Sequence, residues 1–390
     1  MRDVVEVAEA FRGFFGDQDR RPRLFFAPGR VNLIGDHIDY SGGLVLPMAI
    51  DRGTLLVARQ RRDTTIRARS LDRPGEVIAD LGDTRFDPAH DWFSYVIGVA
   101  HTLATDGYAL DAGFDLLFAG DIPDGAGLSS SASLELVTAV AFNTFAGFGL
   151  AATDLAEVGQ RTENDYIGVS CGIMDQLAVA RGRRGHAMLM DCDDMTVSYV
   201  PFPHDRVTLI IANSNHRRSL ADSAYNDRRQ AVESAAELLG TTRLVDLPLT
   251  ELQGGKRHLN EQEFRRARHT ITEQARVIEA AGALRSGDLE RLGTLMRESH
   301  ESLRDDFDVT GPHLDALAAA AWAQPGVVGA RMTGAGFGGC AVVLARRGAE
   351  AEVVEGIERD YLARMGTAAT CFVVGSDDGA RELADEEAEA

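Results

Sequence analysis

A glycine- and serine-rich loop between a predicted strand and a predicted helix constrains the fold of this chain most strongly. The loop occupies residues 123–133 and reads Pro-Asp-Gly-Ala-Gly-Leu-Ser-Ser-Ser-Ala-Ser. The apolar run 114–118 before it predicts a strand, and residues 131–145 carry apolar side chains at helical spacing. Small residues let backbone N–H groups converge on an anion, and a helix N-terminus adds partial positive charge. The junction therefore predicts a phosphate cradle.

This loop is not a Walker A motif. It lacks the Gly-Lys-Ser/Thr ending, and the only lysine of the chain, Lys256, is distant in sequence. Cationic chemistry elsewhere in the chain must therefore use arginine. Glycine and serine also form ordinary turns, so the loop taken alone leaves a purely structural role open.

Length and charge narrow the class of protein. A chain of 390 residues exceeds a typical single domain, so we expect two or more packed lobes. The net charge of −20 repels a phosphate backbone, which argues against nucleic acid as a partner. The longest apolar run, 316–323, is too short to span a membrane. Four dispersed cysteines and the lack of a signal-peptide pattern favour the cytoplasm.

Local patterns predict the remaining elements. Apolar residues at helical spacing predict a first helix ending near Gly16, and strands begin at Leu24. The segments 54–59 and 64–69 resemble the two strands of a hairpin. Long helices are expected over 219–237 and 261–305, with strands at 207–211 and 341–344. Seven acidic residues against one arginine predict that residues 376–390 form a solvated tail.

Two further segments carry polar groups suited to chemistry. In the segment 27–43, Asp36, His37 and Asp39 crowd donors and acceptors into four positions, which could bind a polyol. A solvated loop with an Asx turn is the alternative. In the segment 171–177, Asp175 is a lone carboxylate in an apolar run. Its surroundings could tune it as a base, although a helix-capping role fits equally well.

Together these segments resemble the galactokinase family of the GHMP kinase superfamily. Residues 123–133 are similar to the superfamily's phosphate loop, 27–43 to the galactokinase signature, 171–177 to the segment of the catalytic aspartate, and 331–340 to the C-terminal glycine-rich motif. Residues 213–215 and 223–229 also resemble galactokinases. The resemblance runs in order from about residue 26 to residue 344, which is nearly the whole chain.

The resemblance implies an α+β, two-lobed GHMP kinase fold. Residues 1–200 would form an N-terminal lobe of the ribosomal protein S5 domain 2 type, which binds substrate and nucleotide. Residues 201–376 would form a ferredoxin-like C-terminal lobe, and 377–390 an acidic tail. The implied activity is ATP-dependent phosphorylation of galactose at its anomeric hydroxyl, with Mg²⁺ and with sugar and ATP as the small-molecule partners.

The resemblance also assigns a role to each matching position. Asp175 would act as general base and Arg30 would contact it; a guanidinium favours the ionised form of a neighbouring carboxylate. Glu163 with Ser130 would hold Mg²⁺, and Trp92 with Tyr95 would line the adenine pocket. Four loop residues would bind the nucleotide phosphates: Gly125, Gly127, Ser129 and Ser130. Five residues would join Asp175 in contacting the sugar: Asp36, His37, Asp39, Gly172 and Tyr225.

Three departures from the family pattern leave the acceptor sugar open. The family usually has Glu, Thr and Asn where this chain has Asp36, Ile38 and Ser41. A related sugar such as N-acetylgalactosamine, arabinose or a uronic acid is therefore an alternative substrate. A catalytically silent sugar sensor is the other alternative, but such relatives carry a deletion in the serine loop, and residues 127–133 are undeleted here. The glycines of 331–340 are expected to support packing rather than to bind ligands.

Overall fold

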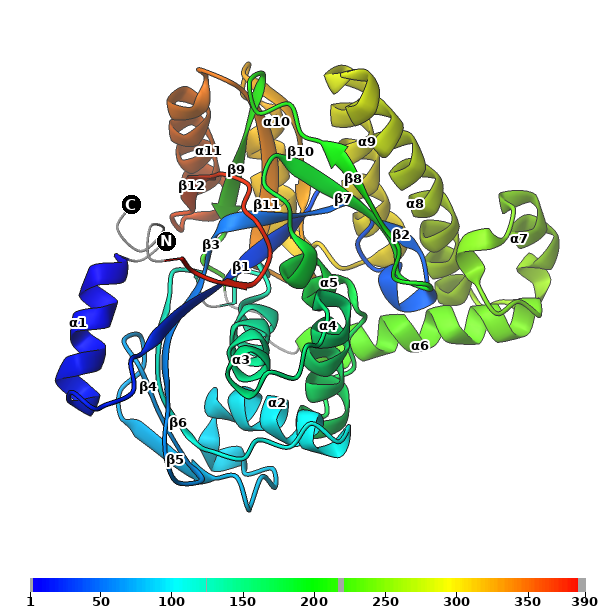
Figure 1. The fold of residues 1–390 in the computed structure, drawn as a ribbon. Coiled ribbons are helices and arrows are strands. Elements are labelled where there is room, and N and C mark those ends of the chain that lie inside the picture. Colours follow the sequence, from blue (N-terminus) through cyan, green and yellow to red (C-terminus); the bar gives the residue numbers. More distant parts are fainter. Residues whose placement is uncertain (1–2, 124, 217–220, 385–390) are drawn as a thin grey trace.

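A six-stranded mixed sheet forms the framework of the N-terminal lobe in the computed structural model (Figure 1). The structure describes residues 3–123, 125–216 and 221–384. The strand order in this sheet is β13-β1-β3-β6-β4-β5. The strands are β1 (Arg23–Asn32), β3 (Pro47–Gln60), β4 (Thr65–Ser70), β5 (Glu76–Asp80), β6 (Phe114–Gly120) and β13 (Arg381–Glu382).

Helices cover both faces of this sheet. On one face lies α1 (Val4–Phe15), whose stripe of buried residues packs on β3 and β6 and whose first turn is capped by the carboxylate of Asp3. On the other face α3 (Ser130–Ala146) and α5 (Met174–Arg181) pack on β1 and β3. Two helices of a second layer, α2 (Phe93–Thr105) and α4 (Ala152–Arg161), pack on α3, and the π-helical turn η3 (Thr162–Ile167) continues α4 and packs on α2.

The C-terminal lobe is built on a four-stranded antiparallel sheet of order β10-β11-β9-β12. A three-stranded sheet of order β2-β7-β8 lies beside α8 and joins the two lobes. The strands are β2 (Leu44–Val45), β7 (His186–Asp191), β8 (Val197–Pro201), β9 (Val207–Asn213), β10 (Val327–Met332), β11 (Cys340–Arg346) and β12 (Thr370–Val374). The helices are α6 (Ala221–Leu239), α7 (Leu249–Gly255), α8 (Glu261–Ser286), α9 (Leu289–Ser302), η6 (Leu303–Phe307), α10 (Gly311–Trp322) and α11 (Glu350–Met365).

The structure confirms the two-lobed α+β fold but corrects two local predictions. β3 and β4 do not form a hairpin, because β6 lies between them and pairs with both. β6 is buried on both faces, and such a strand takes a central position in a sheet. The single helix expected over 261–305 is in fact two helices, since Gly287 ends α8 in the left-handed conformation with a φ of 72°.

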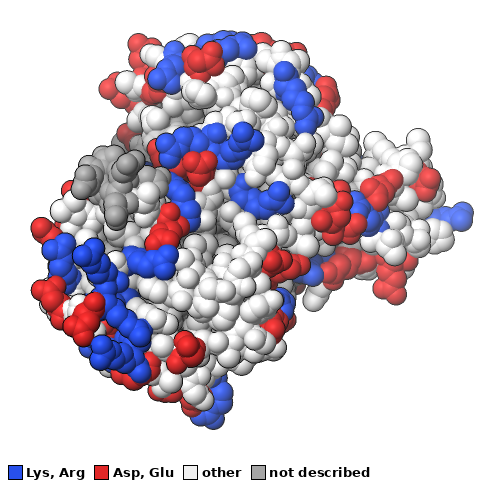
Figure 2. Space-filling view, viewed as in Figure 1, with Lys and Arg blue, Asp and Glu red and all other residues white. Residues whose placement is uncertain are grey.

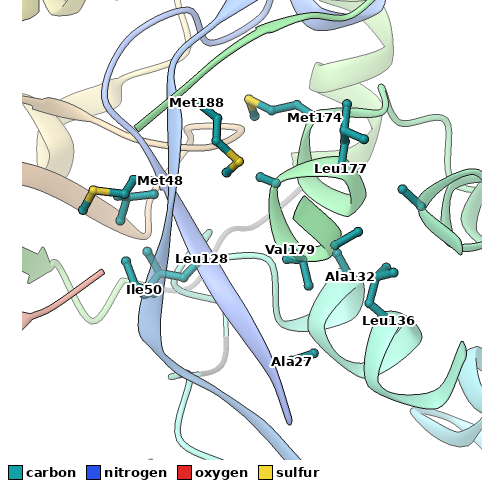
Figure 3. Packing of buried hydrophobic residues seen from close by; sticks show 14 of the residues in the cluster. Ala27, Met48, Ile50, Leu128, Ala132, Leu136, Met174, Leu177, Val179 and Met188 are labelled. Carbon is teal, nitrogen blue, oxygen red and sulfur yellow. The ribbon is translucent and has the colours of Figure 1, made fainter. Parts of the chain in front are cut away.

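The core between the sheet and its helices fixes α3 and α5 in place. Ala27 and Ile50 of the sheet are fully buried, as are Leu136 of α3 and Leu177 and Val179 of α5. Figure 3 shows these side chains directed into one common interior. Burying a leucine or valine contributes about 1.5–3 kcal/mol. This packing therefore fixes the N-termini of two helices, which carry the phosphate loop and Asp175.

Residues 375–384, the C-terminal strap, return from β12 to the N-terminal lobe (Figure 1). The amide of Gly379 donates to the carbonyl of Gly182, and the amide of Ala380 donates to Val179 in the last turn of α5. β13 then pairs with β1, and Leu383 is buried among α1 and the sheet. The strap thus holds the C-terminal end of the helix that begins with Met174 and Asp175.

The prediction of a solvated tail is therefore wrong for residues 377–384; residues 385–390 lie outside the described residues. The acidic side chains of this segment have basic partners that composition alone does not reveal. Asp377 is 7% exposed and pairs with Arg184 at 2.7 Å, and Glu382 pairs with Arg23 at 2.5 Å. These pairs remove the repulsion on which the prediction of a solvated segment rested.

A buried polar network joins the two lobes at the segment 32–36. The imidazole of His269 lies 3.2 Å from the carbonyl oxygen of Asp36 and 2.9 Å from the hydroxyl of Ser302. The carboxylate of Glu273 accepts from the amide of Gly35 at 2.9 Å. Since buried polar groups are costly unless paired, these contacts fix the position of one lobe against the other.

Within the described part of the chain, no helix is both long and apolar enough to cross a bilayer.

Deleting residues 377–390 is expected to lower the free energy of unfolding by at least about 2 kcal/mol, because the buried side chain of Leu383 and the pairing of β13 are lost. Leu383→Ala is the matched point variant and should reproduce about half or more of the effect. Urea unfolding followed by circular dichroism measures both. An unchanged midpoint in the deletion would mean that the strap contributes nothing to stability.

Stability should also fall on acidification because of His269. Burial lowers its pKa to about 4, whereas an unfolded histidine titrates near about 6.5. Between these values the unfolded chain takes up a proton that the folded chain does not, so the free energy of unfolding falls as pH falls, by up to about 1.4 kcal/mol per pH unit. His269→Gln should reduce this slope between pH 6.5 and pH 4 in urea titrations at several pH values. Equal slopes for the two proteins would contradict a buried neutral imidazole.

Candidate active site

A cavity of about 500 Å³ receives side chains from both lobes. Every predicted site residue lines this cavity except Trp92, which lines an adjoining one. From the C-terminal lobe it receives Tyr225 and Asn226 of α6, and Gly334 and Ala335 of the glycine-rich motif. Asn226 and Ala335 are cavity residues for which the sequence pattern predicts no site role. The predicted residues that line it are Arg30, Asp36, His37, Asp39, Tyr95, Gly125, Gly127, Ser129, Ser130, Glu163, Gly172, Asp175 and Tyr225.

Arg30 and Asp175 form an ion pair in the wall of this cavity. The guanidinium donates to both carboxylate oxygens, with Nε to Oδ1 at 2.8 Å and Nη2 to Oδ2 at 2.5 Å. The Arg30 side chain is 4% exposed, whereas that of Asp175 is 31% exposed. The arginine is thus a fixed internal charge, and the carboxylate is the member of the pair that a ligand can reach.

The phosphate loop contacts the same pair. Nη1 of Arg30 donates to the carbonyl of Gly127 at 2.6 Å, and the hydroxyl of Ser129 donates to Oδ2 of Asp175 at 2.6 Å. Ser129 adopts the left-handed conformation, with a φ of 62°, at the position before the first residue of α3. A non-glycine residue is held in that region only where the surroundings require it. This turn directs the start of α3 toward the cavity.

The glycine-rich motif of the C-terminal lobe packs directly on the phosphate loop. Gly334 has a φ of 82°, and a Cβ there would lie 2.8 Å from the carbonyl oxygen of Gly127. A Cβ at Gly339 would lie 3.1 Å from the carbonyl oxygen of Ala126. No other residue type allows so close an approach of two backbones. These contacts support a packing role for the motif, although Gly334 also lines the cavity.

Asp36 is held by the C-terminal lobe. Its Oδ2 lies 2.5 Å from Nη1 of Arg331, and its Oδ1 accepts from the amide of Gly334 at 3.0 Å. Burial raises the pKa of Asp36, and the charge of Arg331 counters part of that rise. Arg331 opens the glycine-rich motif 331–340, and the resemblance implies no site role for it. A fully buried arginine needs an acidic partner, and Asp36 is that partner.

Asp39 is a second carboxylate that faces the cavity. Burial, followed by the negative charge of Asp175, raises its pKa to about 7. Gly172 is required beside it, because a Cβ at that position would overlap Oδ2 of Asp39. The ring of His37 lies nearby, 5.5 Å from that of Tyr225, and its Nε2 is 3.2 Å from the carbonyl oxygen of Ala335. Together these groups form a polar recess with one aromatic wall.

Glu163 lies on the π-helical turn η3, and π-helical turns occur frequently at functional sites. Its side chain is 8% exposed, and burial raises its pKa. Hydrogen bonds from the side chains of Ser131, Cys171 and Gln176 counter part of that rise. Among the residues that the structure describes, no arginine or lysine forms an ion pair with Glu163. A buried carboxylate beside the loop serines and without a cationic partner fits a divalent cation held jointly with phosphate oxygens.

The adjoining cavity, also of about 500 Å³, continues from the loop serines to the sheet. Tyr95, Ser130 and Ser131 line both cavities, whereas Trp92 lines only this one. The indole of Trp92 packs on the ring of Phe118 with centroids 5.5 Å apart. An aromatic recess that joins a phosphate cradle has the composition expected of a nucleotide site.

Comparison with known proteins agrees with this geometry. Residues 9–60 match the galactokinase galactose-binding signature, 94–183 the GHMP kinases N-terminal domain, and 280–364 the GHMP kinases C-terminal domain. The galactokinase of Exiguobacterium sibiricum is 45% identical over 93% of this chain and 94% of its own length. The galactokinase of Bacillus subtilis is 40% identical over 97% of this chain and 98% of its own length.

Solved structures extend the comparison to the fold. Lactococcus lactis galactokinase, solved with galactose, has a TM-score of 0.95 and 37% identity, covering 97% of this chain and 100% of that one. A mevalonate kinase has a TM-score of 0.68 at 19% identity and covers 90% of this chain and 98% of its own, which shows a shared fold alone. From these matches over nearly its whole length, the chain belongs to the galactokinase family of GHMP kinases.

Proposed function

We propose that this protein transfers the γ-phosphoryl group of ATP to the anomeric hydroxyl of galactose, forming galactose 1-phosphate and ADP. The observation that carries this proposal is the contact between Asp175, Arg30 and Ser129 where the polar recess meets the phosphate loop. A carboxylate at that junction can reach both the acceptor hydroxyl and the donor phosphate. The galactokinase relatives described above support galactose as the acceptor.

Asp175 is proposed to take the proton of the anomeric hydroxyl. The sugar oxygen then forms its bond to the γ-phosphorus while the bond between that phosphorus and the β-bridging oxygen breaks, and ADP leaves with the electron pair. Arg30 orients the carboxylate through bidentate hydrogen bonding and places positive charge beside the reacting atoms. Because phosphoryl transfer has a loose transition state, positioning and charge neutralisation supply most of the rate.

The loop residues Gly125, Gly127, Ser129 and Ser130 are proposed to bind the nucleotide phosphates. They precede or begin α3, whose free N–H groups and partial positive charge favour an anion. Ser130 and Glu163 are the residues that would hold Mg²⁺, which neutralises phosphate charge when bound. Trp92 and Tyr95 are proposed to contact the adenine ring in the adjoining cavity.

The recess that contains Asp36, His37, Asp39, Gly172 and Tyr225 is proposed to hold the sugar. With a pKa near 7, Asp39 can donate or accept a hydrogen bond at neutral pH, which suits sugar hydroxyl groups. The alternative of a silent sensor is disfavoured, because the serine loop is undeleted and Asp175 faces the cavity. A different acceptor sugar is also disfavoured by the galactokinase relatives.

The proposed partners are small molecules only. Acidic and basic side chains are interspersed on the face shown in Figure 2, and the net charge is −20, so we propose no nucleic-acid partner. Four free cysteines without a disulfide fit our placement of the enzyme in the cytoplasm.

Asp175→Asn should lower kcat by about 10²–10⁴ while leaving galactose binding within a few-fold, because the amide keeps the size of the side chain but cannot take the proton. An ADP-release assay and calorimetric titration with galactose measure the two effects. Asp165→Asn is the matched control, since Asp165 is exposed on η3 and does not line the cavity. Turnover near that of the unchanged protein would show that Asp175 only positions its neighbours.

Asp36→Glu should raise kcat/KM for galactose relative to galactose analogues enlarged at C6. The added methylene lengthens the side chain by about 1.5 Å, which reduces the room beside it where Asp36 lines the cavity. Ser41→Asn is the control, because it restores another family residue at a position that does not line the cavity. If Asp36→Glu leaves the ratio between the two substrates unchanged, Asp36 does not select at C6.

A further inference from the structure

Behind the phosphate loop, α3 and α5 enclose two polar side chains that line neither cavity. Glu135 lies on α3 and Gln176 follows Asp175 on α5, and both are 0% exposed. Nε2 of Gln176 donates to Oε2 of Glu135 at 3.3 Å. The pair thus connects the helix that starts at the phosphate loop with the helix that carries Asp175.

A third segment, the one that carries Glu163, packs on this pair. Nε2 of Gln176 also lies 4.0 Å from Sγ of Cys171, and the amide counters part of the rise in the pKa of Glu163, which places it near both carboxyl groups. One turn before Glu163, Gly159 of α4 lies against the pair. A Cβ at Gly159 would lie 3.0 Å from Cγ of Gln176 and 3.3 Å from Oε2 of Glu135. The position of Glu163 therefore depends on this pair chiefly through the packing of α4, the helix that leads into η3, against it.

Stability alone does not explain a polar pair at this place. Oε1 of Glu135 and Oε1 of Gln176 are buried and have no hydrogen-bond partner among the described residues. An unpaired buried polar atom destabilises a protein, whereas two apolar side chains of similar shape would fill the same space without that cost. Burial also raises the pKa of Glu135 well above its usual value.

We infer that Glu135 and Gln176 are positioning residues for the divalent-cation site, which hold Glu163 toward the serines of the phosphate loop. They act through Glu163 and do not touch substrate, since neither lines the cavity. This inference rests on the proposed function, in which Glu163 and Ser130 hold Mg²⁺. Substitution of a residue that orients a metal ligand without contacting the metal itself commonly changes metal affinity by about 10–100-fold.

The test measures binding of Mn²⁺ to the full chain in the presence of ADP, by calorimetry and by the electron paramagnetic resonance signal of free Mn²⁺. Glu135→Leu removes the acceptor for Gln176 and should raise the dissociation constant for Mn²⁺ about tenfold or more. Glu135→Gln keeps the shape and an acceptor oxygen, so it should stay within about twofold of the unchanged protein. Galactose affinity should be unchanged in both variants.

Glu163→Gln separates failure of this inference from failure of the proposed site. If Glu163→Gln weakens Mn²⁺ binding but Glu135→Leu, folded and binding galactose normally, does not, the positioning role is overturned. If Glu163→Gln has no effect on Mn²⁺ binding either, the proposed cation site is wrong and the inference falls with it. Should Glu135→Leu fail to fold, Gln176→Met gives the same measurement from the other member of the pair and decides the question.

Discussion

The guanidinium group of Arg30 is the point at which the three segments of the active site meet. It extends from β1 and donates to both carboxylate oxygens of Asp175 at the start of α5 and to the carbonyl oxygen of Gly127 in the phosphate loop. A planar cation with donors in fixed directions sets distance and orientation together, which a lysine could not do. Because Arg30 is buried, its position follows from the packing of β1 against β3 and α5. The packing of the core therefore fixes the positions of the site residues that contact Arg30.

The carboxyl groups around that cation are not equivalent. Asp175 is paired with Arg30, whereas Asp39 has a pKa near 7 because burial and the charge of Asp175 both oppose its ionisation. Glu163 is buried further along the same wall and Glu135 lies behind it, and burial raises the pKa of each. Such a concentration of acids destabilises the ligand-free protein, and it is the arrangement expected where hydroxyl donors and cations are bound. Asp39 can thus hold a proton near neutral pH.

The parts of this site that the sequence reveals are those that need a particular residue type at a fixed spacing. The phosphate loop and Asp175 show the small residues and the lone carboxylate that their chemistry requires. The partners that come from distant segments could not be predicted in this way. Arg331 lies about three hundred positions from Asp36, and no spacing rule joins them.

The placement of β6 between β3 and β4 likewise depends on burial of both its faces, which a local hairpin pattern does not encode. Acidic composition suggested solvation of the C-terminal residues, because the arginines that pair with them lie in other parts of the chain.

The route of the C-terminal strap also determines the order in which the two lobes can fold during synthesis. β13 and the contacts of Gly379 and Ala380 with α5 belong to the N-terminal lobe, yet they are synthesised after every strand of the C-terminal lobe. A growing chain on the ribosome can fold the early strands and helices, but it cannot add the edge strand β13 or form the contacts of the strap with α5 until residue 383 has emerged. The lobe that carries the catalytic groups is thus the first to begin folding and the last to be completed.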